Sequence, residues 1–204
     1  MPAATIGLPA FGIPVRFQRA ELAAHADLSP EADALLKSAR GPEDILEGLH
    51  RSGSNRDFLA ALAMMLPKRQ AVWWACLSAR LLGPAKGSPE AAAIQAAEAW
   101  VQAQSDETRE SAALAAEALD HDGAAAWAAL GAYWSGGSIG AVGAPPVPPE
   151  PHLTGVAVRA ALFMTAAARP SAWEEMVEIG VEILAGESGR EAFARSAAPG
   201  EGRL

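Results

Sequence analysis

The sequence predicts an all-α protein, a compact bundle of about ten helices, and three observations lead to that prediction. Half of the residues are hydrophobic, and alanine, which has the highest helix propensity, dominates among them. β-Branched residues are scarce, and the alternating apolar and polar runs typical of strands are almost absent. Helix-start signals, in which a capping residue, a proline and an acidic residue follow one another, recur along the chain. An irregular α-solenoid is the alternative, although no residue signature repeats at a fixed period.

The chain divides into three parts on the same grounds. Residues 1–16 are expected to form an irregular arm, because prolines and glycines occur repeatedly in this stretch. Its apolar side chains either pack on the rest of the protein or belong to a frayed terminus. Residues 17–186 predict a single helical domain of ordinary size. Residues 187–204 predict a weak helix followed by a disordered tail.

Start and stop signals place the individual helices. Ser29 and Ser88 each precede a Pro–Glu pair, so that a cap, a proline at the first helical position and an acidic first turn coincide. Pro67 ends one helix and begins another, from about residue 67 to residue 82. Gly186 is a C-terminal stop. The other predicted starts are Gly41-Pro42, Ser54 or Asn55, Asp106-Glu107, Asp122, Thr154 and Pro170-Ser171.

The predicted helix at 67–82 carries bulky side chains on every face, and its charged residues lie only at its ends. Val72 and Cys76 share one face, Trp73 lies on the next, and Trp74 on a third. A helix that is bulky all round is expected at the centre of a fold. Cys76 is therefore predicted to be a buried structural thiol and not a nucleophile.

Charge and cysteine content exclude several classes of function. The net charge is −8 and the longest basic cluster is Lys68-Arg69, so the positive stripe that a nucleic-acid-binding protein needs is missing. The uncharged stretch between Asp122 and Glu150 is broken by glycines and prolines, and we expect no membrane insertion. A single cysteine and the lack of a signal-peptide pattern predict a reducing, cytoplasmic location.

No group of residues in the sequence is typical of catalysis or of metal binding. The four histidines have no metal-binding spacing, so no metal is expected. Gly136-Gly137-Ser138-Ile139-Gly140 matches the G-x-S-x-G pattern of serine hydrolases, but no predicted strand precedes it and a proline-rich loop follows it. We therefore expect no cofactor and no enzymatic activity.

Two features are candidates for a binding site. Lys68 and Arg69 begin the predicted central helix, where cations oppose the helix dipole by about 0.3–1 kcal/mol each. We expect an acidic partner for them within the protein, and the alternative is a carboxylate of a ligand or of a protein partner. The second feature is the segment 134–152, because long, almost uncharged loops are usually functional or disordered.

The segment 134–152 is stiffened by its prolines into an extended, polyproline-like conformation. Such a segment lies either along an aromatic groove of its own domain or in the groove of a partner. We favour its own domain, because Ile139, Val142 and Val147 would otherwise be exposed.

Three stretches of the sequence occur together in a known family. They are LPKRQAVWWAC (66–76), AYWSGGS (132–138) and PHLTG (151–155). With them, residues 55–185 resemble an uncharacterised family of bacterial all-helical proteins, a domain of unknown function. The resemblance implies an accessory role beside type VI secretion components, and it transfers no activity and no functional residue.

Two functional hypotheses follow. The first is a non-enzymatic accessory or adaptor protein of a bacterial type VI secretion apparatus, with a protein partner that binds where Lys68 and Arg69 meet the segment 134–152. The alternative is a small-molecule-binding protein or enzyme with a tryptophan-lined pocket. Trp73, Trp74, Trp134 and His152 would line that pocket. The candidate partner- or ligand-binding residues are Lys68, Arg69, Trp73, Trp74, Trp134, Gly136, Gly137 and His152.

Overall fold

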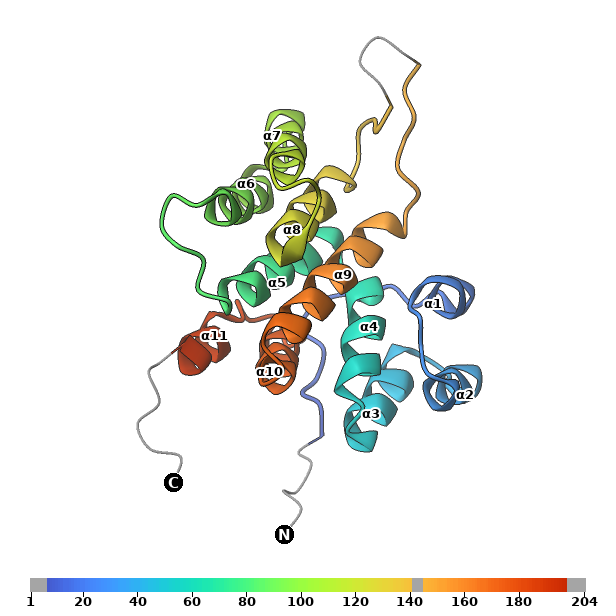
Figure 1. Ribbon diagram of the computed structural model, residues 1–204. Helices are drawn as coiled ribbons and strands as arrows, with labels where there is room; N and C mark the ends of the chain where they lie inside the picture. Colours follow the sequence, from blue (N-terminus) through green and yellow to red (C-terminus); the bar gives the residue numbers. More distant parts are fainter. Residues whose placement is uncertain (1–6, 141–144, 198–204) are drawn as a thin grey trace.

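The computed structural model describes residues 7–140 and 145–197, and within them the chain forms eleven α-helices and no β-strand (Figure 1). The predicted all-α bundle is confirmed. None of the described helices combines the length and the apolar character that crossing a membrane requires. The helices are α1 (Arg19–His25), α2 (Pro30–Ser38), α3 (Pro42–Ser52), α4 (Asn55–Met65), α5 (Lys68–Arg80), α6 (Pro89–Ala103), α7 (Asp106–Glu117), α8 (Gly123–Tyr133), α9 (Leu153–Ala168), α10 (Ala172–Leu184) and α11 (Arg190–Ala197).

Helix α5 lies at the centre of the bundle, as the large side chains on all of its faces predict. Helices α6, α8, α9, α10 and α11 all pack against it, and Figure 1 shows α1–α3 at one end of the molecule and α6–α7 at the other. The Trp74 ring is fully buried, and its Nε1 donates a hydrogen bond to the Met176 carbonyl oxygen at 3.0 Å. Cys76 is buried beside it, and burial raises the pKa of its thiol far above the ordinary value. The thiol therefore stays protonated and unreactive at neutral pH.

Small residues let the core helices approach one another closely. A Cβ added to Gly180 of α10 would lie 2.7 Å from Cζ2 of Trp74, and a Cβ added to Gly155 of α9 would lie 2.7 Å from Sδ of Met64. Neither position has room for a side chain. The large rings and thioethers thus fill the space that the glycines and alanines leave.

Predicted helix signals are found at most of the expected places. The hydroxyls of Ser29 and Ser88 accept hydrogen bonds from backbone N–H groups in the first turns of α2 and α6, both at 3.2 Å. The Asp122 side chain caps α8, and Gly186 follows α10 with a φ of +89°, the left-handed conformation that favours glycine after a helix.

The predicted cap at Thr154 is wrong. Helix α9 begins at Leu153, and His152 occupies its N-cap position without a side-chain hydrogen bond. The Thr154 hydroxyl donates instead to the carbonyl oxygen of Trp134 at 3.1 Å. A tertiary contact thus takes the hydroxyl group that local capping would have used.

The N-terminal arm runs along the helical body over residues 7–16. The backbone N–H groups of Gly12 and Arg16 donate hydrogen bonds to carbonyl oxygens of α10 and α4, at 2.9 and 2.8 Å. The first part of the predicted arm, residues 1–6, lies outside the described residues. The side chains of the arm that pack against the core are Leu8, Phe11, Ile13 and Val15.

One helix near each terminus completes the bundle. Helix α1 is not among the predicted helices, because it follows Gln18, and glutamine is not one of the residues preferred at helix N-caps. Helix α11 lies where the sequence predicts a weak helix, and Arg195 pairs there with Glu182 of α10 at 2.7 Å. The rest of the predicted tail, residues 198–204, lies outside the described part of the chain. The division of the chain into arm, domain and tail stays a prediction.

Candidate functional site

Between α8 and α9, the described residues leave the helical body as two neighbouring arms (Figure 1). The Ile139 N–H donates a hydrogen bond to the Val147 carbonyl oxygen at 2.9 Å. The Ser138 hydroxyl accepts two further hydrogen bonds from backbone N–H groups of the segment, at 3.1 and 3.0 Å. We call the described residues 138–140 and 145–151 the proline hairpin.

The segment 134–152 is expected from its sequence to pack against its own domain. Its base does so, but the proline hairpin does not. The Val147 side chain is 50% exposed and Ile139 is half-buried, while Val142 lies outside the described residues. The two arms partly cover each other, since a Cβ added to Gly140 would lie 3.2 Å from Cγ2 of Val147. This mutual cover reduces the need for a groove on the body. The exposed prolines are Pro145, Pro146, Pro148 and Pro151.

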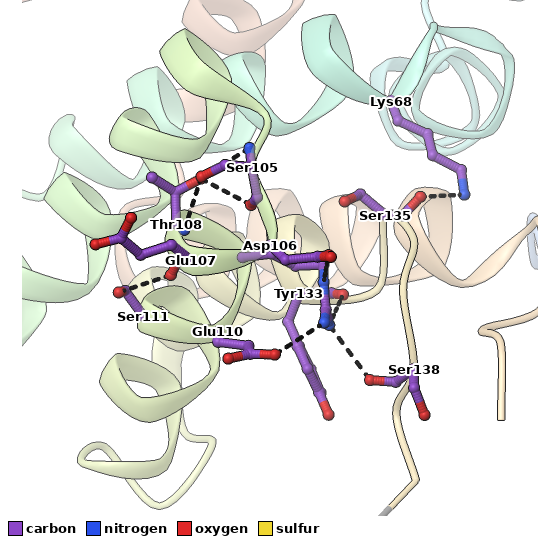
Figure 2. A network of polar contacts seen from close by, with 11 residues as sticks. Lys68, Ser105, Asp106, Glu107, Thr108, Glu110, Ser111, Tyr133, Ser135 and Ser138 are labelled. Atoms are coloured by element: carbon purple, nitrogen blue, oxygen red, sulfur yellow. Dashed lines mark hydrogen bonds and ion pairs between the residues drawn. The ribbon is translucent and has the colours of Figure 1, made fainter. Parts of the chain in front are cut away.

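The two cations at the start of α5 bind carbonyl oxygens instead of the expected carboxylates. Lys68 Nζ donates to the Ser135 carbonyl oxygen at 2.8 Å (Figure 2), and Arg69 Nε donates to the Val101 carbonyl oxygen at 2.7 Å. Ser135 lies two residues beyond the end of α8, and Val101 lies in the last turn of α6. Carbonyl groups at helix C-termini lack intrahelical partners and carry partial negative charge. Arg69 is thus stabilised by the C-terminal end of α6, and Lys68 by a carbonyl group of the segment that follows α8.

The Lys68 ammonium is held in a partly dehydrated setting. Burial lowers its pKa from the ordinary lysine value, the charge of Arg16 lowers it further, and the charge of Glu21 opposes both. The contact with Ser135 therefore fixes the start of the segment to α5 with a cation that has lost part of its hydration.

A buried arginine holds the other side of the hairpin base. Arg109 of α7 is 5% exposed, and its Nη1 donates to the carbonyl oxygens of Tyr133 and Ser138, at 3.5 and 3.3 Å (Figure 2). Asp106 and Glu110 lie 3.1 and 3.4 Å from the guanidinium and balance its charge. The guanidinium also lies over the Tyr133 ring, 5.2 Å from its centroid. One side chain thus joins α7, the end of α8 and the first residue of the proline hairpin.

The two predicted glycines of the site differ in what they do. Gly137 has a φ of +65°, and an added Cβ would lie 2.6 Å from three atoms of the Arg109 guanidinium. Both the backbone conformation and the close approach of Arg109 therefore require glycine. Gly136 has no positive φ, and an added Cβ there would meet open space.

Aromatic side chains hold both ends of the segment. The Trp134 ring packs edge-on against Trp127 at a centroid distance of 5.9 Å. At the other end, the His152 ring stacks on His25 of α1 at 3.7 Å, with 4° between the ring planes. With Lys68, these contacts tie the base of the segment to α1, α5 and α8.

The four residues of the proposed tryptophan-lined pocket have separate sets of neighbours. Trp73 Nε1 donates to the Ser188 carbonyl oxygen at 2.7 Å, and the Arg190 guanidinium lies over its ring at 5.1 Å. Trp74 is inside the core, and Trp134 and His152 contact the rings described above. The structure brings Lys68, Trp134, Gly136, Gly137 and His152 to the base of the segment, and it places Arg69, Trp73 and Trp74 in other contacts.

Arg109 was not among the predicted site residues, although the sequence holds a signal for it. Arg109 follows Asp106 at a spacing typical of an exposed helical ion pair. The buried positions of α7 are Arg109, Ala112 and Ala116, which follow the spacing of a single helix face. A stripe of small residues with one arginine at its end therefore predicts an arginine that faces the protein.

Comparison with known proteins places the chain in a family. No curated protein and no solved structure matches it. The sequence profile of a family of unknown function, DUF6931, matches residues 45–184, which include α5, α7, the proline hairpin and its base. The arm, α1, α2 and α11 lie outside the match. The match confirms the resemblance to a family of unknown function, and the chain belongs to DUF6931.

Proposed function

We propose that this protein is a non-enzymatic adaptor whose proline hairpin binds a protein partner. One observation carries the proposal: a nearly uncharged, proline-rich hairpin projects from the helical body, and its base is held by Lys68 and Arg109. Binding elements are commonly loops that a rigid scaffold positions. The hairpin has that arrangement, because residues of α1, α5, α7 and α8 hold its base while most of its described prolines are exposed.

The contacts at the base support a role in positioning. Lys68 and Arg109 are cations that have lost hydration, and both donate to carbonyl oxygens of the segment. A charge-assisted hydrogen bond is stronger than a neutral one and more restrictive in geometry. The base is thus built to hold one orientation, and a fixed orientation lowers the entropy that a partner must remove on binding.

We further propose that the adaptor works in the cytoplasm of a bacterial cell. The single cysteine is buried, and the net charge of −8 favours a partner with a basic surface. Components encoded at type VI secretion loci are the first candidates for that partner, because of the resemblance described above.

Site-specific photo-crosslinking tests the proposal. The photoreactive residue p-benzoylphenylalanine replaces Val147 in the hairpin or, as the control, Gln95, which is exposed on α6. Both proteins are made at the native level in the native cell and are irradiated there. We expect a discrete crosslinked protein with the probe at Val147 and none of that mass with the probe at Gln95. Equal adducts from both positions, or none from Val147, would contradict the proposal.

A further inference from the structure

We propose that residues 145–150 form a polyproline II ligand and that the partner is a protein with a solvent-exposed, aromatic-lined groove that accepts it. This inference rests on the proposed function, since it names the chemistry of the partner that the hairpin binds. Three observations carry it: the run of prolines, their exposure to solvent, and the charge of the hairpin.

The proline run is set in an extended conformation before any partner binds. Proline fixes its own φ near −65°, and the residue before a proline is driven out of the helical region. Every residue from 145 to 150 is a proline, precedes a proline, or both. The segment therefore has few conformations to lose on binding, which is the basis of polyproline II recognition.

The contacts between the two arms of the hairpin involve Val147 and leave most of the prolines exposed. A polyproline II helix has three residues per turn, so Val147 and Glu150 share one ridge, Pro145 and Pro148 the second, and Pro146 and Pro149 the third. Val147 is the residue bound to the other arm, through its N–H and carbonyl groups and through its side chain against Gly140. The exposed prolines lie on the other two ridges. Pro145, Pro146 and Pro148 are exposed and Pro149 is half-buried.

The chemistry of the exposed ridges defines the groove. Proline rings pack on flat aromatic side chains, and their carbonyl oxygens accept hydrogen bonds from tryptophan N–H or tyrosine O–H groups. No proline offers an N–H, so a partner strand cannot extend the hairpin as a sheet along this run. Glu150 is the only charged residue of the hairpin, and it is exposed. We therefore expect a basic residue at the rim of the groove, next to the end of the proline run.

A lipid surface is the other class of target for an exposed apolar hairpin, and the observations disfavour it. Peripheral membrane segments combine basic residues with large apolar or aromatic ones. Residues 138–151 contain no lysine, arginine, tryptophan or phenylalanine. The net charge of −8 also repels an anionic bilayer.

The test measures the affinity of full-length variants for the protein that photo-crosslinking at Val147 identifies, purified and titrated by calorimetry. The double variant Pro145→Ala/Pro148→Ala removes one ridge and loosens the backbone, and we expect it to weaken binding about tenfold or more. Pro89→Ala is the matched control, because Pro89 is an exposed proline at the start of α6, and we expect unchanged affinity. Glu150→Gln is expected to weaken binding by a smaller factor and to reduce its salt dependence.

The outcomes separate this inference from the proposed function. A partner that binds the double variant as tightly as the unchanged protein leaves the adaptor in place and overturns the polyproline II inference. Binding of the unchanged protein to vesicles of phosphatidylglycerol and phosphatidylethanolamine, with no loss in Glu150→Gln, overturns it in favour of a membrane. If no adduct forms at Val147, the proposed function is contradicted, and so is this inference. Thermal unfolding of each variant, expected to match the unchanged protein, shows that the fold is retained.

Discussion

Helix α8 and the proline hairpin lie close together in the chain and share a nearly uncharged composition, yet they lie in opposite environments. No charged residue occurs from residue 123 to residue 149. In α8 most residues are buried, whereas Val147 is 50% exposed and most of the hairpin prolines are exposed. Apolar composition alone therefore does not decide whether a segment enters the core.

What decides whether each segment is buried is whether its backbone groups can form hydrogen bonds inside the protein. Alanine lets α8 bond its N–H and carbonyl groups within the helix, so the whole segment can be dehydrated between α5, α6, α7 and α9. Proline has no N–H group and leaves its carbonyl oxygens without intrahelical partners. Burying the run 145–149 inside the protein would leave those oxygens without donors, at roughly 1–3 kcal/mol each. Water, or the polar groups of a partner, satisfies them when the run is outside.

The sharpest way to break the comparison is to place the same charge in both segments. Ala129 is fully buried in α8, so Ala129→Asp buries a carboxylate with no partner. We expect a loss of about 4 kcal/mol or more in the free energy of unfolding, or no folded protein. Val147→Asp puts the carboxylate in water, and we expect a change within about 0.5 kcal/mol. Urea denaturation followed by circular dichroism measures both, and similar losses at the two positions would contradict the assignment of opposite environments.

Steric size at the middle of α8 sharpens the comparison next. An added Cβ at Gly131 would meet Val72 Cγ2 at 3.4 Å and Val158 Cγ2 at 3.5 Å, which are ordinary contacts. Gly131→Ala is therefore expected to be neutral or to stabilise by about 0.5–1 kcal/mol, because alanine is the better helix former. Gly131→Leu overpacks the same space and is expected to destabilise by about 1–3 kcal/mol. Thermal unfolding of the pair checks the opposite signs, and a stabilising leucine would show that α8 is not tightly packed.

At the hairpin base, the two adjacent glycines form a matched pair. Gly137→Ala forces alanine into a left-handed backbone conformation and pushes the Arg109 guanidinium away, and we expect a loss of about 1–2 kcal/mol. Gly136→Ala has neither problem and is expected to change little. Hydrogen exchange of the Ile139 N–H reports on the hairpin itself, and we expect faster exchange only in Gly137→Ala. Equal exchange in both variants would mean that Arg109 does not hold the hairpin.

Most of the fold could be predicted from the sequence, because local sequence signals specify most of the helices. The caps at Ser29 and Ser88 act within one turn, and the bulk around α5 indicates a central helix whatever its neighbours are. Helix α1 lacks such a signal: Gln18 makes no capping bond, and the helix is held by tertiary contacts such as His25 against His152. Tertiary contacts of this kind leave no trace in local patterns.

The candidate site was predicted only in part, and for the same reason. The positions of Lys68 and the segment 134–152 stand out because both break a local rule, one of charge and one of loop length. The partner of Lys68, the Ser135 carbonyl oxygen beyond α8, is set by packing and carries no residue signature. Arg109 obeys a local rule, since it pairs with Asp106 at the start of α7, and this ordinary appearance conceals its contact with the hairpin.

The smallest change in the free energy of unfolding is expected at Lys68, where a stabilising hydrogen bond and the cost of burying a charge nearly cancel. Lys68→Met removes the charge-assisted hydrogen bond to Ser135, worth about 1.5–3 kcal/mol, and it also removes a charge whose burial lowers the pKa of the group. We expect a net loss below about 1 kcal/mol at pH 7.

The difference in stability between the unchanged protein and Lys68→Met is expected to change with pH, and the shifted pKa of Lys68 fixes the direction of that change. The folded protein releases the Lys68 proton at a lower pH than the unfolded chain does, because burial lowers the pKa in the folded state only. Between the folded pKa and the ordinary lysine value of about 10.4, the unfolded chain binds more protons, so the stability of the unchanged protein rises with pH relative to Lys68→Met. Below the folded pKa the difference is constant. Urea denaturation of both proteins from pH 7 to pH 10.5 measures it, and titrations shared by the two proteins cancel. A difference that falls as the pH rises would show that Lys68 gains more from its contacts at the hairpin base than it loses by burial, and the base would then be the more strongly stabilised part of the segment.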